Sequence, residues 1–408
     1  IPACTAGMAP RRTLMRVVPP LSRDSLPRRS LLLGLLAAPL TLAACSKDEK
    51  KKAATPSSST TATASAPSRP AVTGKGLPAD LLAVMTTVYL GGKVPAAGAV
   101  ATSLAKRTVG TRALTVTGST GNWKGTAVAT VVQGKDVTLL VKDKTWKVVG
   151  GWWPSLKVAR APIATMRVLA IGSDARTPEP VEKSRADALH IIGVDSRGVG
   201  GIVGIPRDSW VPLSTGGNGK VNAALVFGGV KGQVATVARA TGVPIDGYVI
   251  AGFKGFKDMI RAIGGIPYVA DRALKSIDGL QITKKGNNLL DAQRALAFAR
   301  ERKNLPNGDF GRSAHQGELI KAGMVMARRL GAARLAGLLG KMAPHLGTDL
   351  TPTEVLNLSA SVLLGNPAAV RNTVVPGAIG TRERQSVVLL GAAARSTFKD
   401  IRNGRLGA

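Results

Sequence analysis

Charged side chains in this sequence gather where predicted strands and helices end, which is where ligands bind in open α/β sheets. Asp174 and Arg176 directly follow an apolar run that is expected to be a buried strand. A turn sequence between two later apolar runs predicts a hairpin over residues 187–206. Its open end would bring two carboxylates and two guanidinium groups together: Arg185, Asp187, Arg207 and Asp208. The alternative is that each of these residues forms an ordinary ion pair at the surface.

Arg300 and Arg302 stand at the end of an Ala/Leu/Arg-rich segment, 291–300, that is expected to be helical. Residues two apart on a helix point about 200° apart, so both arginines can face one ligand only where the helix ends. The helix-breaking sequence at 304–308 predicts such an end here.

The next predicted helix, from about 309 to 330, carries three polar residues on one face. Asp309, Arg312 and Gln316 recur at spacings i, i+3 and i+7, starting at the helix N-terminus, where anions are favoured. The alternative is a solvated face with a local Asp309–Arg312 pair worth about 0.3–0.5 kcal/mol.

These residue types favour chemistry on a pyrophosphate group. Asp174 and Asp187 are candidate ligands for a hard divalent cation, Mg²⁺ or Mn²⁺, because such ions are often held by one or two carboxylates plus substrate phosphates. No Walker loop and no Gly-x-Gly-x-x-Gly motif follows the first strand, and His190 is expected in the core. Planar guanidinium groups suit phosphate oxygens, and five arginines supply them: Arg185, Arg207, Arg300, Arg302 and Arg312.

The elements that must position these residues follow an α/β pattern. Residues 165–408 alternate strand runs with helical periodicity, which predicts an α/β/α sandwich with a mixed central sheet and its core at 166–330. Strands are expected at 168–171, 188–194, 201–205, 248–250, 266–269, 370–375 and 387–390. Helices are expected at 230–240, 253–263, 291–300, 309–330, 332–342 and 352–364.

Residues 77–164 predict a small α+β accessory domain. A helical pattern at 81–88 precedes strand runs at 113–117, 126–132, 137–141 and 145–149, and tight polar turns between the runs favour antiparallel hairpins. Trp152 and Trp153 follow, and we interpret them as core or interface residues rather than as a sugar platform.

The N-terminal residues predict export and lipidation. Arg28 and Arg29 resemble a twin-arginine signal, and the apolar run after them is too short to span a bilayer well. It ends in Leu-Ala-Ala-Cys, which looks like a lipobox, so residues 1–44 would be a signal peptide and Cys45 would carry lipid. Residues 45–76 would form a disordered tether, because their Lys, Ser, Thr, Ala and Pro cannot bury a core. The alternative is a buried apolar helix with an incidental cysteine. Translation is expected to start at Met8 or Met15.

The composition of the 408 residues narrows the class of protein. Apolar residues make up 44%, too many for a disordered chain, and two cysteines exclude a disulfide-rich scaffold and a Cys-based zinc domain. The formal net charge of +32 requires an anionic partner. Few aromatic residues (3%) and the export signal argue against nucleic acid.

Taken in chain order, the short motifs resemble the LytR-CpsA-Psr family of cell-wall glycopolymer ligases, in an actinobacterial-type lipoprotein variant. The resemblance is carried by residues 171–176, 185–187, 205–209, 220–224, 228–229, 262–266, 300–302 and 308–312, with Gln316.

The resemblance implies a phosphotransferase in the cell envelope, at the outer face of the cytoplasmic membrane and anchored through Cys45. It would join a polyprenyl-pyrophosphate-linked glycopolymer to peptidoglycan by a phosphodiester bond and release polyprenyl phosphate, with the lipid tail in an apolar groove between sheet and helices. Asp187 or Asp208 would accept the proton of a muramic-acid hydroxyl. Mg²⁺ would bind at Asp174 and Asp187. Catalytic roles would fall to Arg185, Asp187, Arg207, Asp208, Arg300 and Arg302, and substrate binding to Arg176, Lys220, Asn222, Asp309, Arg312 and Gln316.

The sequence departs from the family at several points. A lipoprotein signal replaces the transmembrane helix that many members have, His315 stands where many have Arg, and Glu301 stands where many have an aromatic residue or His. Two other functions stay open: a non-catalytic lipoprotein that binds anionic wall polymers, and a polyprenyl-pyrophosphate hydrolase. Binding alone needs no metal carboxylates, so Asp174 and Asp187 disfavour the first.

Overall fold

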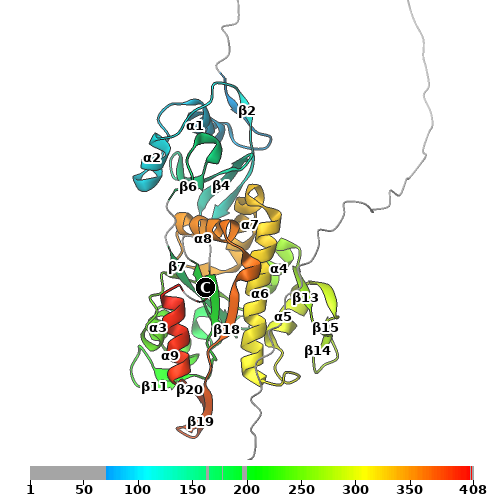
Figure 1. Ribbon diagram of the computed structural model, residues 1–408. Helices are drawn as coiled ribbons and strands as arrows, with labels where there is room; N and C mark the ends of the chain where they lie inside the picture. The colour runs from blue at the N-terminus through cyan, green and yellow to red at the C-terminus, as the bar shows by residue number, and fades with distance from the viewer. Residues whose placement is uncertain (1–69, 162–164, 177, 195–199, 405, 407–408) are drawn as a thin grey trace, which may run out of the picture. The chain divides into compact units, whose positions relative to one another are not determined.

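The computed structural model describes residues 70–161, 165–176, 178–194, 200–404 and 406 (Figure 1). These residues belong to one compact unit. The predicted signal peptide, Cys45 and most of the predicted tether lie outside the described residues. The predicted end of the tether at residue 76 is wrong, because Val72–Thr73 is already a strand of the folded unit and Val72 is buried in its core. Within the described ranges, none of the helices is both long enough and apolar enough to cross a membrane.

A six-stranded mixed sheet forms the centre of the fold, which confirms the predicted α/β class. Its strands are β7 (Met166–Ser173), β8 (Ala186–Val194), β9 (Gly200–Gly204), β12 (Gly247–Ala251), β17 (Gly347–Thr348) and β18 (Arg371–Val374). Their order across the sheet is β17-β12-β7-β8-β9-β18. β7 runs parallel to β12 and antiparallel to β8, and β8 pairs with β9 as the predicted hairpin.

The α-helices largely follow the predicted periodicity. They are α1 (Ala79–Leu90), α2 (Gly98–Ala105), α3 (Ala223–Thr241), α4 (Phe253–Ile263), α5 (Ala292–Arg300), α6 (Gly308–Leu330), α7 (Leu335–Met342), α8 (Pro352–Leu364) and α9 (Ala392–Arg402). The sequence patterns missed α2, which has eight residues and buries only Leu104. They also missed α9, although Ala394, Phe398 and Ile401 form a buried stripe on it. α3 starts at Ala223 rather than 230, and Gly229 bends it with φ of 59°.

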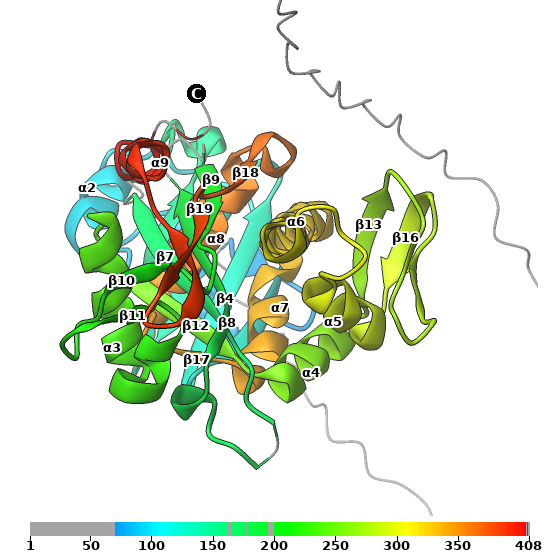
Figure 2. The same ribbon diagram turned by 90° about the horizontal axis from the view of Figure 1, so that it is seen from below.

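Alternate residues of β7 and β8 point to opposite faces of the sheet, because side chains alternate along a strand. On one face, Leu169, Ile171 and Leu189 pack into a buried core with α3 and α9. On the other face, Ala170 and Ile192 line an apolar cavity that residues of α4, α6, α7 and α8 also line. Figure 2 shows α3 and α9 on one side of the strands and α4 and α6 on the other.

The accessory residues form an antiparallel sheet of β3 (Thr117–Trp123), β4 (Thr126–Gln133), β5 (Asp136–Lys142) and β6 (Trp146–Trp152), ordered as in the chain. The run at 113–117 covers β2 (Leu114–Thr115), which pairs with β1 (Val72–Thr73), and only the first residue of β3. β3 itself is polar and has no strand pattern in the sequence. Trp153 is fully buried and donates from Nε1 to Thr138 Oγ1 (2.8 Å), so it is a core residue.

Four small antiparallel pairs among the described residues lie outside these two sheets. They are β10 (Trp210–Pro212) with β11 (Asn218–Lys220), β13 (Ile266–Ala270) with β16 (Gly286–Leu290), β14 (Leu274–Lys275) with β15 (Gln281–Thr283), and β19 (Ala378–Arg382) with β20 (Gln385–Leu389). The predicted strands at 266–269 and 387–390 are therefore strands of hairpins rather than of the central sheet.

Two glycines let α6 pack closely on the central sheet. A Cβ atom at Gly204 of β9 would overlap Ser313 Oγ, and one at Gly317 of α6 would overlap the amide of Asn372 on β18. That amide is anchored, because its Nδ2 donates to a carbonyl and a carboxylate of α6 at 2.9 and 3.0 Å. The close approach fixes where the polar face of α6 lies relative to β8 and β9.

We predict opposite effects for alanine at two glycines of α6. Gly317→Ala is expected to lower the free energy of unfolding by about 1–3 kcal/mol, because the added methyl group overpacks the contact with Asn372. At Gly323 a Cβ would meet nothing within 4 Å, so Gly323→Ala is expected to raise it by up to about 1 kcal/mol through helix propensity. Urea unfolding measures the free energy of unfolding of both variants. Equal changes in the two variants would contradict the proposed contact between Gly317 and Asn372.

Candidate functional site

Arg207 lies at the centre of the charged cluster, in the residues that follow β9. Its Nη1 donates to Asp187 Oδ1, and its Nε lies 3.9 Å from Asp208 Oδ2 and 3.7 Å from Asp309 Oδ1. Burial by itself lowers the pKa of this guanidinium, but Asp187, Asp309 and Asp208 together raise it above its ordinary value. The side chain thus joins β8, the residues after β9 and the start of α6.

Asp187 reaches the cavity because β8 carries one extra residue at this point. Gly172 of β7 pairs with Ala188, whereas the next residue, Ser173, pairs with Ala186. Asp187 is therefore the unpaired residue of a β-bulge. In a regular strand it would point toward α3 and α9. A bulge re-aims a side chain, and Asp187 lines the cavity on the opposite face.

Asp174 follows β7 and lies beside Arg185. The Asp174 backbone N donates to the Arg185 carbonyl (2.9 Å), and the Arg185 backbone N donates to Asp174 Oδ1 (2.8 Å). Burial raises the pKa of Asp174, and the negative charge of Asp187 raises it further. The two carboxylates therefore lie close enough to repel each other.

This pair of carboxylates, Asp174 and Asp187, fits a hard divalent cation. Among the residues that the structure describes, no group of three or more His, Cys, Asp and Glu could hold a metal ion. An ion here would need its remaining ligands from water or from substrate oxygens, which is how Mg²⁺ usually binds in phosphoryl-transfer sites. Its charge would offset the repulsion between the carboxylates.

The predicted polar face of α6 points into the site. Arg312 is 6% exposed, and its Nη2 lies 2.5 Å from Asp309 Oδ1. Burial lowers the pKa of Arg312; Asp309 opposes this shift, and Arg207 and Arg302 reinforce it. Arg312 and Gln316 line the cavity, and Gln316 Nε2 donates to a backbone carbonyl of α5 (3.0 Å).

α5 ends at Arg300, and the chain leaves the helix at Glu301. The helix end predicted from the sequence at 304–308 therefore lies directly after Arg300. Glu301 has φ of −65° and ψ of 131°, and its Oε1 accepts from the backbone N of Arg302 (2.9 Å) and of Asn304 (3.1 Å). Glu301 therefore builds the turn. The Arg300 guanidinium lies 4.7 Å from the ring centroid of Phe253 and lines the cavity. Arg300 and Arg302 are both exposed, and Arg302 does not belong to the cavity lining.

Lys220 and Asn222 brace the cluster from outside the cavity. Lys220 Nζ lies 3.1 Å from Asp208 Oδ1. Asn222 is buried, and its backbone N donates to the Arg207 carbonyl (3.2 Å) while its carbonyl accepts from Ala186 N (3.2 Å). These bonds hold β8 and the residues after β9 in register.

Arg176 and Arg185 present exposed side chains. The Arg176 backbone N donates to Glu179 Oε2 (2.9 Å), which fixes the turn after Asp174. Arg185 is fixed through its backbone bonds to Asp174. Both guanidinium groups are thus at the rim of the charged cluster rather than within it.

An apolar cavity of about 420 Å³ adjoins the charged cluster. The charged side chains in its lining are Asp187, Arg300 and Arg312, and Gln316 lies beside them. Most of the remaining wall consists of apolar side chains of β7, β8, β12, α4, α6, α7 and α8. The sequence patterns missed this contribution of α7 and α8, and missed Phe253, because apolar helix faces look alike whether they border a core or a cavity.

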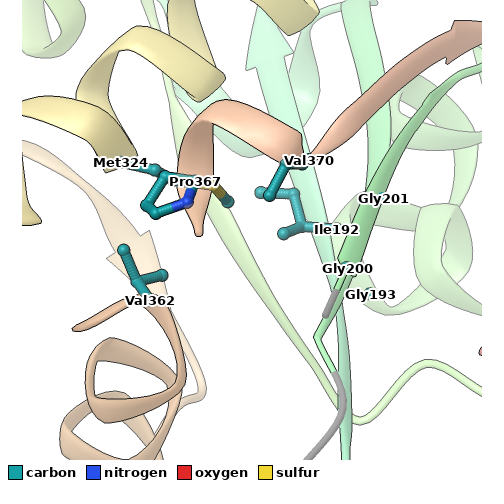
Figure 3. Close-up of a pocket in the computed structure, with 8 residues that line it drawn as sticks. All are labelled: Ile192, Gly193, Gly200, Gly201, Met324, Val362, Pro367 and Val370. Atoms are coloured by element: carbon teal, nitrogen blue, oxygen red, sulfur yellow. The ribbon is translucent and has the colours of Figure 1, made fainter. Parts of the chain in front are cut away.

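A second, much smaller apolar pocket lies next to this cavity. Ile192, Met324 and Val362 line both spaces (Figure 3). Its volume is about 10 Å³, which is about the space of one water molecule. It is therefore too small for a substrate group.

Two histidines near the site are neutral packing residues. His190 is buried, its Nε2 lies 3.0 Å from the Ser313 carbonyl, and burial lowers its pKa to about 4, as expected for a core residue. His315 stacks on Phe298, with ring centroids 4.1 Å apart, and burial lowers its pKa. His315 therefore packs against α5 instead of adding charge to the cavity.

A charged end next to a long apolar space is suited to an amphipathic ligand. Guanidinium groups would bind an anionic head, and the cavity would remove an apolar tail from water. The paired carboxylates add a place for a cation beside the head group. Together these features can hold a lipid phosphate or pyrophosphate.

Known proteins are similar to parts of this chain in sequence and in fold. TagU of Bacillus cereus (strain AH820), a polyisoprenyl-teichoic acid–peptidoglycan teichoic acid transferase, is 33% identical over 196 residues, which is 47% of this chain and 62% of TagU. TagV of Bacillus subtilis (strain 168), with the same transferase name, is 35% identical over 187 residues, 43% of this chain and 48% of TagV. The match thus spans less than two thirds of each relative.

The crystal structure of B. subtilis TagV is also similar to this fold. It superposes with a TM-score of 0.51 at 28% identity and covers 59% of this chain and 97% of the TagV chain. The sequence profile of the LytR_cpsA_psr family matches residues 154–401, which reaches well beyond the motifs at 166–330. The chain belongs to the LytR_cpsA_psr family.

Proposed function

We propose that this protein is a phosphotransferase that joins a polyprenyl-pyrophosphate-linked glycopolymer to peptidoglycan. The observation that carries the proposal is the apolar cavity of about 420 Å³ with Asp187, Arg300 and Arg312 in its lining. The transferase names of TagU and TagV support the same substrate class. The pyrophosphate would lie among the arginines, and the prenyl tail would fill the cavity.

In the reaction, a peptidoglycan hydroxyl attacks the phosphorus atom that carries the glycopolymer. A new P–O bond forms, the P–O bond to the bridging oxygen breaks, and polyprenyl phosphate leaves. Charge on the transferred phosphoryl oxygens is stabilised by guanidinium groups already held in place, chiefly Arg207, Arg300 and Arg312. Arg302 and Arg185, which are exposed, would close over the head group from the rim.

The hydroxyl proton passes to Asp187. Asp187 lines the cavity, whereas Asp208 does not belong to the lining. Both carboxylates pair with a cation, Asp208 with Lys220 and Asp187 with Arg207 through Oδ1, so the proton would go to Asp187 Oδ2. Asp208 and Asp309 instead keep Arg207 and Arg312 in position. Phosphoryl transfer depends mainly on positioning and electrostatics, so a weakly basic carboxylate is sufficient.

Asp174 and Asp187 would hold Mg²⁺ together with pyrophosphate oxygens. The ion would neutralise part of the negative charge of the pyrophosphate. The support for this part of the proposal is the donor set and the raised pKa of Asp174.

The enzyme would act at the outer face of the cytoplasmic membrane, anchored by lipid on Cys45. The support is the sequence alone: the paired arginines Arg28 and Arg29, the short apolar run and the lipobox that ends in Cys45. An anchor at this point would keep the catalytic residues close to membrane-bound donor.

We predict that Arg300→Ala lowers kcat/KM by about 100-fold, because one guanidinium is lost from the charged end of the cavity. Arg294→Ala is the matched control: Arg294 lies on the same helix, half exposed, 3.9 Å from Asp291 Oδ2. The assay supplies purified lipid-linked pyrophosphate donor, Mg²⁺ and peptidoglycan. Loss of activity in the control to the same extent would contradict a specific role for Arg300.

The products of the same assay distinguish the ligase from the hydrolase and from the binding lipoprotein. Polymer attached to peptidoglycan supports the ligase. Free phosphorylated polymer without attachment would show the hydrolase. Retention of polymer by wild-type protein without turnover would show a binding lipoprotein.

We predict that chelation with EDTA abolishes activity and that Mg²⁺ restores it. Independently of turnover, millimolar Mg²⁺ is expected to raise the Tm of the wild type, because ligand binding to the folded state stabilises it. Asp174→Asn is expected to remove this rise. Asp258→Asn, on α4 and paired with Lys254 and Arg261, is the control that keeps it. A Tm response that persists in Asp174→Asn would exclude this ligand.

We predict that Cys45→Ser abolishes incorporation of labelled palmitate and moves the protein from the membrane fraction to the soluble fraction. Labelling of Cys45→Ser at the wild-type level would rule out this anchor.

A further inference from the structure

The accessory sheet reaches the apolar cavity through one side chain, Trp123. This residue ends β3, is 2% exposed and belongs to the lining of the cavity. Its Nε1 donates to the Leu350 carbonyl (2.9 Å), a bond between residues far apart in the chain. The indole is thus held in a defined position at the cavity wall.

Trp123 lies at the opposite end of the central sheet from the charged cluster. Leu350, which accepts its hydrogen bond, packs with Met166 and Val168 at the start of β7. Asp174 follows the last residue of the same strand. The eight residues of β7 span roughly 23 Å at about 3.3 Å per residue, so the charged residues and the indole are separated by about the length of the strand.

The wall that carries Trp123 is tightly fixed to the cavity-lining helices. Trp123 shares a buried cluster with Leu335, Leu339 and Val355 of α7 and α8, which also line the cavity. Gly121 of β3 packs so closely on α7 that a Cβ atom would overlap the Ala336 carbonyl.

Hydrogen bonds add to this packing. The Ala336 backbone N donates to Thr130 Oγ1 (3.3 Å), and the Gly337 backbone N donates to Ser119 Oγ (3.2 Å). The accessory sheet and α7 therefore form one rigid wall rather than two loosely joined surfaces.

We propose that Trp123 closes the end of the cavity and sets the length of prenyl tail that the protein buries. The proposal rests on the proposed function, since it assigns the cavity to the tail of a lipid pyrophosphate. Each isoprene unit that enters the cavity removes apolar surface from water and adds affinity. Units beyond the length that reaches the indole find no further space inside the cavity, so affinity stops rising there. The accessory sheet is thereby a specificity-determining part of the lipid site.

The test is competition binding with prenyl monophosphates of graded length, from farnesyl to undecaprenyl, against a fluorescent prenyl phosphate. For the wild type, affinity is expected to rise with tail length and then level off. Trp123→Ala is expected to move the plateau to longer tails, with about a tenfold gain for the longest. Trp146→Ala is the matched control, because Trp146 is equally buried in the accessory core and does not belong to the cavity lining.

The outcomes separate this inference from the proposed function. Identical length dependence in wild type and Trp123→Ala would overturn the role of Trp123 and leave the lipid site intact. Absence of binding at every length, in the wild type, would overturn both. The same plateau shift in Trp146→Ala would assign the effect to loosened packing and reject the proposal.

A second measurement uses only the wild type, so it does not depend on the folding of a variant. A prenyl phosphate with a diazirine at the far end of a tail of plateau length is expected to label the peptide that contains Trp123. A probe with the diazirine next to the phosphate is expected to label residues near Arg300. Labelling by the first probe anywhere but β3, α7 or α8 would refute the proposed end of the cavity.

Discussion

The Arg207 guanidinium is the interaction on which the rest of the site depends. It lies between Asp187 on β8, Asp208 next to it and Asp309 at the start of α6. Removing one charge from such a partly buried cluster leaves its partners uncompensated, which costs more than the pair itself contributes. The cluster therefore specifies how the hairpin and α6 come together, more than it adds to overall stability.

The site has a polar part, the charged cluster around Arg207, and an apolar part, the cavity. The carboxyl end of β7 and the open end of the β8–β9 hairpin carry the charges, whereas farther along these strands the side chains that line the cavity are mostly apolar, with the neutral His190 among them. α6 repeats this division, with Arg312 and Gln316 in its first half and Met324 and Met326 later along the cavity. One sheet and one helix thus form both the head-group and the tail regions of an amphipathic site.

Most of the strands and helices that carry site residues could be predicted from the sequence, because their patterns are formed by neighbouring residues in the chain. Apolar periodicity gave β7, β8, β9, α4, α5 and α6 within a few residues, and the helix breaker after Arg300 predicted the turn that Glu301 forms. β3 could not be predicted, because its alternating polar and glycine residues acquire strand structure only by pairing with β4. The helix start at Ala223 was missed because Gly229 interrupts the pattern.

The sequence by itself determined the residue types, their order and their placement at the ends of elements, because these are properties of neighbouring residues along one chain. Only the tertiary structure decided that the charges of the hairpin meet those of α6, through Arg207 and Asp309. The bulge at Asp187 re-aims its carboxylate to the cavity, and no local pattern encodes a bulge that depends on the pairing of two strands. Likewise, only packing over a long sequence separation brings Trp123 to Leu350. A cavity and its ends are formed by contacts between segments that are distant in the sequence, so local sequence patterns do not reveal them.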